Sequence, residues 1–180
     1  MPRDIVYFDL ETQRTANDAG GWDKKRDMKM SVGVTYSTRT GEYRVFHESR
    51  VNELIDQLVR ADLVVGFNVV NFDFEVLMGY TILDLKHQIQ SFDMLVDLEQ
   101  RLGHRLALDA LAQATLGAGK TAGGMDAIKW WREGRVLDIA EYCCFDVKVT
   151  KLLHEYACRH RQLFYHDRFQ QKRSVTTEWN

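Results

Sequence analysis

A short apolar run near the start of the chain, IVYFDLET at residues 5–12, ends in two acidic residues, Asp9 and Glu11. A run of this length and composition is typical of a buried β-strand, where residues two apart project from the same face. Buried charge is costly unless it is paired, neutralised or bound to a metal ion. The run therefore predicts a strand that carries a site, although a lone Asp-x-Glu also occurs in structural and solvent-exposed roles.

Composition limits the classes of protein that the chain can belong to. With 180 residues, 45% of them hydrophobic, it can bury one substantial core, and we expect a single domain over residues 1–180 with a basic C-terminal extension at about 159–180. The net charge of −2 gives no overall basic field, so any polyanion must be bound by local patches or cations.

The cysteine usage and the lack of targeting signals in the sequence both predict the same cellular compartment. The chain has three cysteines, no charged-then-apolar leader and no apolar run of about 20 residues, which predicts a reduced, cytoplasmic protein without a membrane segment. Cys143 and Cys144 are adjacent and lack a zinc spacing, so we expect them to pack as small hydrophobic residues.

The order of predicted elements indicates a mixed α/β sheet. Three strands come first, the last two joined as a hairpin across Thr40-Gly41, and helices then alternate with strands in β-α-β order. The polar segment 12–29 is expected to be a long loop. Strands are expected at 4–10, 30–36, 42–46, 62–66 and 89–92, with a β-like segment at 174–179. Helices are expected at 52–61, 72–78, 94–101, 106–116, 125–133 and 136–160.

Two further acidic motifs follow the first. Asn68 and Asp73 belong to the sequence NVVNFD, which follows the strand at 62–66 and opens a helix. Tyr142 and Asp146 are four residues apart in the longest helix and therefore project from one face. Taken singly, Asp73 could cap its helix, and the other pair could be a snorkelling aromatic and a solvated acid. Three such motifs in this order favour a shared acidic site.

These motifs resemble those of the DEDD, or DnaQ-like, 3′–5′ exonucleases. The resemblance places four residues on the acidic metal ligands of that family: Asp9, Glu11, Asp73 and Asp146. It places Tyr142 on the tyrosine that defines the DEDDy subgroup, whereas the DEDDh subgroup would need histidine at the position of Glu141.

The resemblance covers about residues 4–155 and implies a ribonuclease H-like fold, a mixed sheet in which a three-strand meander precedes β-α-β crossovers, flanked by helices. The segment 106–117 is similar to the helix that these exonucleases carry between their second and third motifs. Within the superfamily, the chain looks most like the YprB-type predicted exonucleases, some of which are attached to helicases.

The implied activity is hydrolysis of phosphodiester bonds at the 3′ end of DNA or RNA, with release of nucleoside 5′-monophosphates. Hydrolysis adds negative charge to a phosphate, and two divalent cations roughly 3.5–4 Å apart can stabilise the attacking and leaving oxygens. Carboxylates favour Mg²⁺ or Mn²⁺ as these two cations. In the family, the tyrosine hydroxyl orients the attacking water, and Tyr142, with an ordinary pKa of about 10, suits hydrogen bonding better than general base catalysis.

The expected substrate is a single-stranded nucleic acid with a free 3′ end, and the expected protein partner is a helicase or another repair or processing protein. Leu10 and Thr12 flank the first motif and are expected near the terminal nucleotide, with Asn68 as a further contact. Lys120, in the sequence GAGKT, could touch a substrate phosphate or lie in a flexible connector. A P-loop is excluded because its first glycine would be Ala114 and a helix precedes it.

Other interpretations stay open at this point. A ribonuclease H-type endonuclease also uses acidic clusters, and a non-catalytic nucleic-acid-binding or helicase-associated module could retain the fold.

Asp93 is expected to cap the helix that follows it, and at least one of Trp130 and Trp131 is expected to pack in the core. The basic segment 159–180 could follow substrate phosphates or form a solvated edge hairpin.

Overall fold

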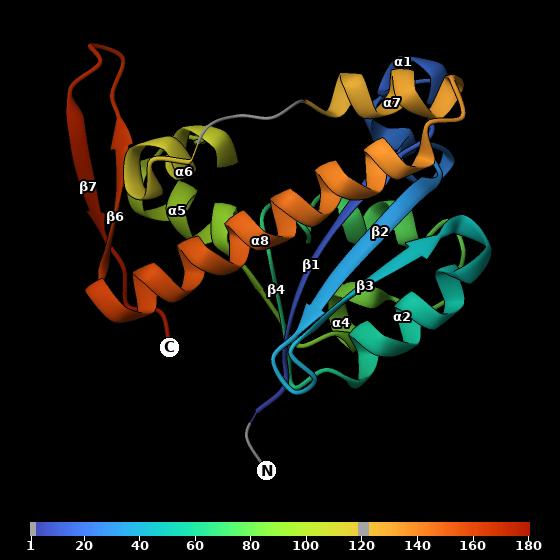
Figure 1. The fold of residues 1–180 in the computed structure, drawn as a ribbon, viewed down its shortest axis with the longest axis horizontal. Helices are drawn as coiled ribbons and strands as arrows, with labels where there is room; N and C mark the ends of the chain where they lie inside the picture. Colours follow the sequence, from blue (N-terminus) through green and yellow to red (C-terminus); the bar gives the residue numbers. More distant parts are fainter. Residues whose placement is uncertain (1–2, 119–122) are drawn as a thin grey trace.

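The centre of the computed structural model is a five-stranded mixed sheet with strand order β3-β2-β1-β4-β5 (Figure 1). The strands are β1 (Ile5–Thr12), β2 (Met30–Ser37), β3 (Glu42–His47), β4 (Leu63–Gly66) and β5 (Ser91–Asp93). Pairing is antiparallel from β1 to β2 and from β2 to β3, and parallel from β1 to β4 and from β4 to β5. The structure describes residues 3–118 and 123–180. The predicted meander followed by β-α-β crossovers is confirmed.

Helices cover both faces of this sheet. They are α1 (Ala16–Ala19), α2 (Val51–Arg60), α3 (Asp73–Leu77), α4 (Leu85–Gln88), α5 (Met94–Leu102), α6 (Leu108–Leu116), α7 (Gly124–Arg132) and α8 (Val136–His160), with the short 3₁₀ helices η1 (Trp22–Asp27) and η2 (Glu48–Arg50). One core lies beneath α8 and α5, and the other beneath α2, α3 and α4. Nowhere in the described part of the chain is a helix both long and apolar enough to cross a membrane.

The alternation of β1 divides its side chains between these two cores. Tyr7 belongs to the core beneath α8, whereas Phe8 and Leu10 belong to the core beneath α2. Because successive strand residues point to opposite faces, Asp9 and Glu11 share the face of Tyr7 and point toward α8. The pairing with β2 shifts register directly after Glu11, which places a bulge at this end of the strand.

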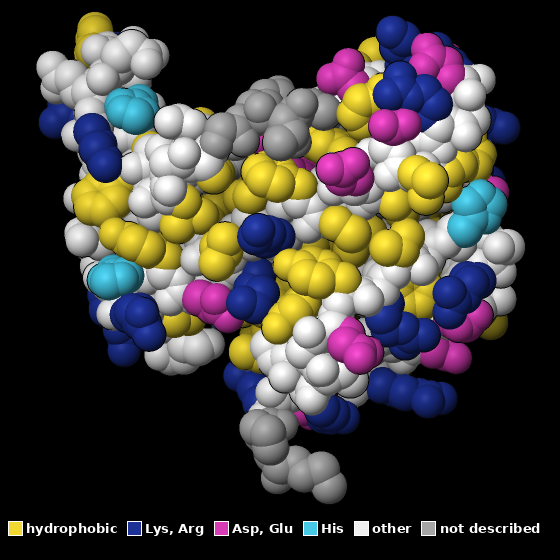
Figure 2. Space-filling view, viewed as in Figure 1, with side chains coloured by type: hydrophobic (Ala, Val, Ile, Leu, Met, Phe, Trp, Pro, Cys, Tyr) yellow, Lys and Arg dark blue, Asp and Glu magenta, His cyan; other side chains and the backbone are white. Residues whose placement is uncertain are grey.

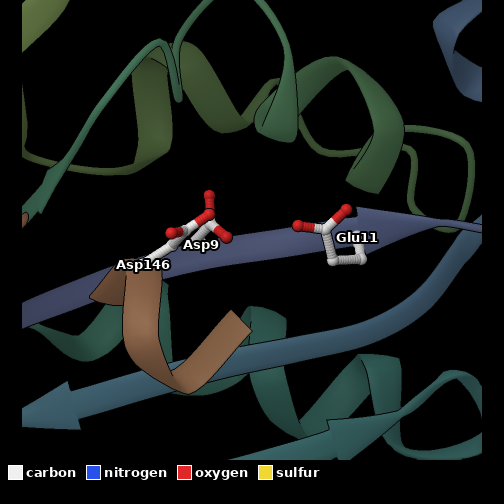
Figure 3. Close-up of side chains that lie close together, drawn as sticks. All are labelled: Asp9, Glu11 and Asp146. Atoms are coloured by element: carbon white, nitrogen blue, oxygen red, sulfur yellow. The ribbon is translucent and has the colours of Figure 1, made fainter. Parts of the chain in front are cut away.

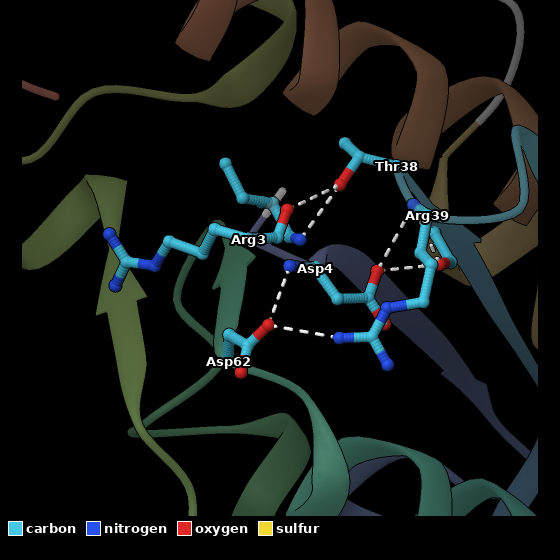
Figure 4. Close-up of polar contacts among 7 residues, drawn as sticks. Arg3, Asp4, Thr38, Arg39 and Asp62 are labelled. Atoms are coloured by element: carbon cyan, nitrogen blue, oxygen red, sulfur yellow. Dashed lines mark hydrogen bonds and ion pairs between the residues drawn. The ribbon is translucent and has the colours of Figure 1, made fainter. Parts of the chain in front are cut away.

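The opposite end of β1 is held by a polar network (Figure 4). The Asp4 backbone N–H donates to the Asp62 carboxylate at 2.7 Å, and the Arg39 guanidinium donates to the same carboxylate at 3.0 Å. The Ile5 N–H donates to Thr38 Oγ1 at 2.8 Å. These contacts join the first strand to the hairpin on one side and to β4 on the other, which fixes its register in the sheet.

Most predicted elements are confirmed to within two residues, and three regions differ. The expected loop at 12–29 contains α1 and η1, and α1 begins with a capping box between Thr15 and Asp18. The short α4 has no counterpart in the prediction. The C-terminal segment forms a hairpin, one of the two alternatives for it, as a separate two-stranded sheet of β6 (Gln162–His166) and β7 (Lys172–Thr176), and the sequence does not predict the first of these strands. Short helices bury few residues, so their periodicity is weak in the sequence.

His154 lies on α8 in the core and is 3% exposed. Its Nδ1 is 3.0 Å from the Tyr7 hydroxyl oxygen, and its ring stacks on Trp179 at 5.9 Å between centroids. Burial disfavours the charged imidazolium and lowers the pKa of His154 from 6.5 to about 4. The folded protein therefore holds this side chain neutral.

This burial predicts a specific loss of stability in acid. The unfolded chain binds a proton on this histidine below pH 6.5, whereas the folded chain resists protonation until about pH 4. The contribution of His154 is therefore present above pH 6.5 and is lost as the pH falls toward 4, by up to about 3 kcal/mol. Denaturant unfolding at a series of pH values should show this extra slope in the wild type relative to His154→Gln. Parallel curves for the two proteins would contradict it.

Candidate metal centre and active site

Three carboxylates converge on the α8 side of β1 (Figure 3). Asp9 and Glu11 come from β1 and Asp146 from α8, and one carboxylate oxygen of each lies within 4.8 Å of the others. Figure 3 shows Asp9 and Asp146 side by side, with the Glu11 carboxylate turned toward the same space. Close-set carboxylate oxygens are suited to holding a hard divalent cation. The structure thus brings together three of the four predicted ligands.

The fourth predicted ligand, Asp73, is tied to the first motif by a hydrogen bond. It is the first residue of α3 and is 2% exposed, and its Oδ1 accepts the Leu10 backbone N–H at 3.0 Å. The N-cap residue of α3 is Phe72, whose side chain accepts no cap hydrogen bond. Its charge helps to raise the pKa of Glu11, so Asp73 belongs to the same electrostatic cluster although it lies outside the tight group of three.

Asp93 holds the turn that carries the second motif. It caps α5 as predicted, accepting the backbone N–H groups of Leu95 and Val96. It also accepts the N–H groups of Asn68 at 2.8 Å and Val70 at 3.0 Å. Asn68 has a left-handed φ of 70°, a conformation that asparagine tolerates better than most residues. One buried carboxylate therefore fixes both the turn and the following helix.

Gly66 permits the close approach of this turn to the first strand. A Cβ atom at Gly66 would overlap the Val69 side chain and would lie 3.1 Å from the Phe8 carbonyl oxygen. Both neighbours are fully buried, so neither can move away without disturbing the core. The missing side chain lets the second motif return toward β1 directly after β4.

Two adjacent residues of α8 contact the acidic cluster. Tyr142 lies one helical turn before Asp146 on the same face of α8, close enough for the Asp146 charge to raise the pKa of its hydroxyl. The Cys143 thiol lies 3.4 Å from both the carbonyl oxygen and Oδ2 of Asp9. Burial raises the pKa of Cys143 well above its usual value, so the thiol keeps its proton and can act as a hydrogen-bond donor to Asp9. The sequence predicts Cys143 only as a packing residue, although its place between Tyr142 and Asp146 is a usable signal of this contact.

Burial and mutual repulsion dominate the electrostatics of the site. Burial raises the pKa of Asp9 well above its ordinary value, and the neighbouring Asp146 charge raises it further. The pKa of Glu11 is raised in the same way by burial, then by Asp9 and Asp146. Burial and Asp9 raise the pKa of Asp73. Without a bound cation, these carboxyl groups favour their protonated forms, as expected of a site that binds positive charge.

A hollow of about 580 Å³ opens beside the cluster and has the size of a small-ligand pocket. Three predicted substrate contacts line it, namely Leu10, Thr12 and Asn68. Lys120, the fourth, lies outside the described residues. Trp22 and Met125, which no sequence pattern singles out, also line the hollow and are 67% and 70% exposed. Isolated apolar residues in polar loops and helix starts carry no periodic signal, so only the folded chain reveals them.

The helix α7 begins against the acidic cluster. A Cβ atom at Gly124, its first residue, would lie 3.9 Å from Glu11 Oε2. Helix N-termini carry partial positive charge, so this end of α7 favours the carboxylate. Further along the same helix, Trp130 and Trp131 are both partly buried against the core, as expected for at least one of them.

The role of Asp93 can be tested by substitution. Asp93→Ala removes the acceptor of four backbone N–H groups, so we expect the free energy of unfolding to fall by about 2–4 kcal/mol. Asp93→Asn keeps one acceptor oxygen and should cost less. Urea denaturation measures both, with the exposed Asp56→Ala as a matched control. A loss no larger than that of the control would show that this carboxylate does not hold the turn.

Comparisons with known proteins agree with this architecture. The chain shares its fold with the family B DNA polymerase from the hyperthermophilic archaeon Pyrobaculum calidifontis, with a TM-score of 0.65 at 17% identity. That alignment covers 87% of this chain but only 25% of the polymerase chain, and at this identity it shows the fold alone. No curated protein matches the chain. A family model described as the RNase_H superfamily matches residues 6–158, so the chain belongs to the ribonuclease H superfamily.

Proposed function

We propose that this protein is a metal-dependent 3′–5′ exonuclease of the DEDDy type that releases nucleoside 5′-monophosphates from DNA or RNA. The observation that carries the proposal is the position of the Tyr142 hydroxyl, which lies near enough to Asp146, Glu11 and Asp9 for their charges to raise its pKa. A generic acidic cluster does not require a tyrosine hydroxyl beside its carboxylates. The proposal includes the narrower YprB-type placement that the motifs suggest.

The donor set fits two divalent cations. Asp9, Glu11 and Asp146 offer close-set oxygens, and Asp73 offers the oxygen that does not accept the Leu10 N–H. Hard oxygen donors favour Mg²⁺ or Mn²⁺. When bound, two such ions would stabilise the attacking and leaving oxygens of a phosphodiester. The raised pKa values of these carboxyl groups support the fit because bound cations would relieve their repulsion.

Tyr142 is suited to orient the attacking water. Burial raises the pKa of its hydroxyl above 10, and the charges of Asp146, Glu11 and Asp9 raise it further. The group therefore keeps its proton at neutral pH and acts as a hydrogen-bonding partner, not as a general base. Trp130 packs edge-on against the Tyr142 ring, with 6.3 Å between centroids, which restricts the position of the hydroxyl.

The shape of the hollow supports recognition of a chain end. Residues of α1 and of α7 both line it, and an ion pair of 2.7 Å between Asp18 and Arg132 joins the two helices. A hollow that α1 and α7 bound at one end accommodates a terminal nucleotide more readily than a continuous strand. Trp22 and Met125, both largely exposed, offer apolar surface to the terminal base, while Leu10 and Thr12 lie near its sugar and phosphate.

Several finer expectations stay predictions. They are the preference for single strands, a helicase or another processing protein as partner, and a cytoplasmic location. A ribonuclease H-type endonuclease or a non-catalytic binding module would use the same fold, and the activity measurement below separates both from the proposal.

Metal binding should change stability independently of activity. Burial and Asp146 raise the pKa of Asp9, so its ionised form costs folding free energy at neutral pH when no cation is bound. We therefore expect Asp9→Asn to raise the metal-free unfolding midpoint and to abolish most of the stabilisation by Mg²⁺. In the wild type this stabilisation should reach about 2.7 kcal/mol at 100 times the dissociation constant. Thermal unfolding with and without Mg²⁺ measures both effects, with the exposed Asp56→Asn as control.

Activity is tested with end-labelled oligonucleotides in Mg²⁺ or Mn²⁺. The wild type should shorten a 5′-labelled strand progressively from its 3′ end. Tyr142→Phe should lower kcat by about 100-fold because the water loses its orientation, and Asp146→Asn should lower it further. Exposed Tyr43→Phe serves as the matched control. Cleavage of a circular strand would instead support an endonuclease, and binding without cleavage would support the non-catalytic module.

A further inference from the structure

A second hollow, of about 490 Å³, lies between the C-terminal hairpin and the loop that precedes α6. His104 and Arg105 line it from the loop, and Tyr165, Arg168 and Phe169 line it from the hairpin. The hairpin follows residue 158, where the match to the family model ends. The hairpin side of this surface therefore lies outside the region that the superfamily model matches.

The base of the hairpin is firmly attached to the body of the protein. The Phe164 N–H donates to Thr115 Oγ1 at 2.9 Å, and the same hydroxyl donates to the Phe164 carbonyl oxygen at 3.0 Å. Leu163 is fully buried and Val175 is 6% exposed, both within the core beneath α8. The tip of the hairpin projects beyond α6 (Figure 1). A projecting tip on a buried base is a preorganised surface rather than a loose tail.

The tip presents cations and an aromatic ring. The Asp167 carboxylate is engaged within the turn, where it accepts the Phe169 and Gln171 N–H groups and pairs with Arg173 at 2.9 Å. Arg168 and Lys172 instead lie over aromatic rings at 4.8 and 4.5 Å, and neither forms an ion pair within the described residues. Their charges are thus available to an anion.

The Phe169 side chain at this tip is 67% exposed, although a protein of this size can bury such a residue. Figure 2 shows the hairpin as a lobe at the upper left that carries basic, His and hydrophobic side chains. Basic groups interleaved with aromatic rings are the surface chemistry that binds single-stranded nucleic acid.

Arg105 connects this surface to the acidic site. One of its nitrogens donates to Asn68 Oδ1 at 3.2 Å, and another pairs with Glu99 at 3.3 Å. Asn68 lines the hollow beside the carboxylates, while Arg105 lines the hollow beside the hairpin. This hydrogen bond therefore links a residue that lines one hollow to a residue that lines the other, so the two hollows are neighbours on the surface.

We propose that the β6–β7 hairpin and Arg105 bind the single-stranded nucleic acid upstream of its 3′ end while the end itself occupies the acidic site. The inference rests on the proposed function for the identity of the strand. Arg105, Arg168 and Lys172 contact phosphates, and Phe169 stacks on a base. Stacking and phosphate contacts do not depend on the identity of the base, so binding tolerates any sequence.

The test is fluorescence anisotropy of labelled single strands of about 16 and about 3 nucleotides, measured in EDTA so that no cleavage occurs. Phe169→Ala should weaken binding of the long strand at least about fivefold. The double variant Arg168→Glu/Lys172→Glu should weaken it and reduce the slope of log affinity against log salt by about 0.7 for each phosphate that the variant no longer binds. Both changes should affect the long strand more than the short one.

Matched controls separate this surface from general effects of charge and hydrophobicity. Arg60→Glu repeats the charge reversal on the exposed end of α2, and Ile82→Ala repeats the truncation at a side chain that is 104% exposed. Both controls should bind as the wild type does. Thermal unfolding should show that all variants are folded, because every altered side chain is exposed.

Two outcomes overturn the inference. In the first, the hairpin variants bind the long strand with wild-type affinity and salt dependence, so that the hairpin serves another partner. In the second, the wild type binds neither strand. Binding that depends on the hairpin without cleavage in Mg²⁺ or Mn²⁺ would instead support this inference and overturn the proposed exonuclease activity, so the two proposals fail separately.

Discussion

Repulsion among close-set, poorly solvated carboxylates is the constraint on which the rest of this structure depends. Asp9, Glu11 and Asp146 offer oxygens within 4.8 Å of one another, and Asp73 adds a fourth charge that acts on the same group. Burial and like charge both disfavour the ionised forms, as the raised pKa values show. Such an arrangement persists only because the surrounding sheet and helices are stable enough to hold it. The fold supplies that support from several directions.

Neutral donors position two carboxylates of the site. The Leu10 N–H donates to Asp73, and the Cys143 thiol contacts Asp9. A lysine or arginine in these places would neutralise the cluster and compete with a bound cation for its charge. Neutral donors fix the geometry while leaving the negative charge available. This choice of partners is what distinguishes a candidate metal centre from an ordinary surface ion-pair network.

In the proposed function, the two hollows divide recognition of a strand into separate tasks. The hollow bounded by α1 and α7 contacts the acidic cluster, where shape and the Asp18–Arg132 ion pair favour an end. The hollow beside the hairpin carries basic side chains and an exposed ring, which suit a flexible polyanion of any sequence. Arg105 joins them through Asn68. Net negative charge overall is therefore compatible with a local basic path, because Debye screening limits each field to about 10 Å.

The sequence by itself determined the elements whose burial is periodic. The run at 5–12 became β1, and the helix expected at 136–160 became α8 with the same limits. It also identified the acidic motifs, because their spacing within single elements is local information. Tyr142 and Asp146, for example, share a face for purely helical reasons.

Tertiary structure alone decided how these elements meet. The Asp73–Leu10 hydrogen bond joins residues 63 apart, and the Cys143–Asp9 contact joins residues 134 apart. The hydrogen bonds that attach the C-terminal hairpin join Thr115 to Phe164, 49 residues away, so no local sequence pattern predicts them. Periodicity records which face of an element is buried but not which partner buries it, since that choice depends on packing summed over the whole chain.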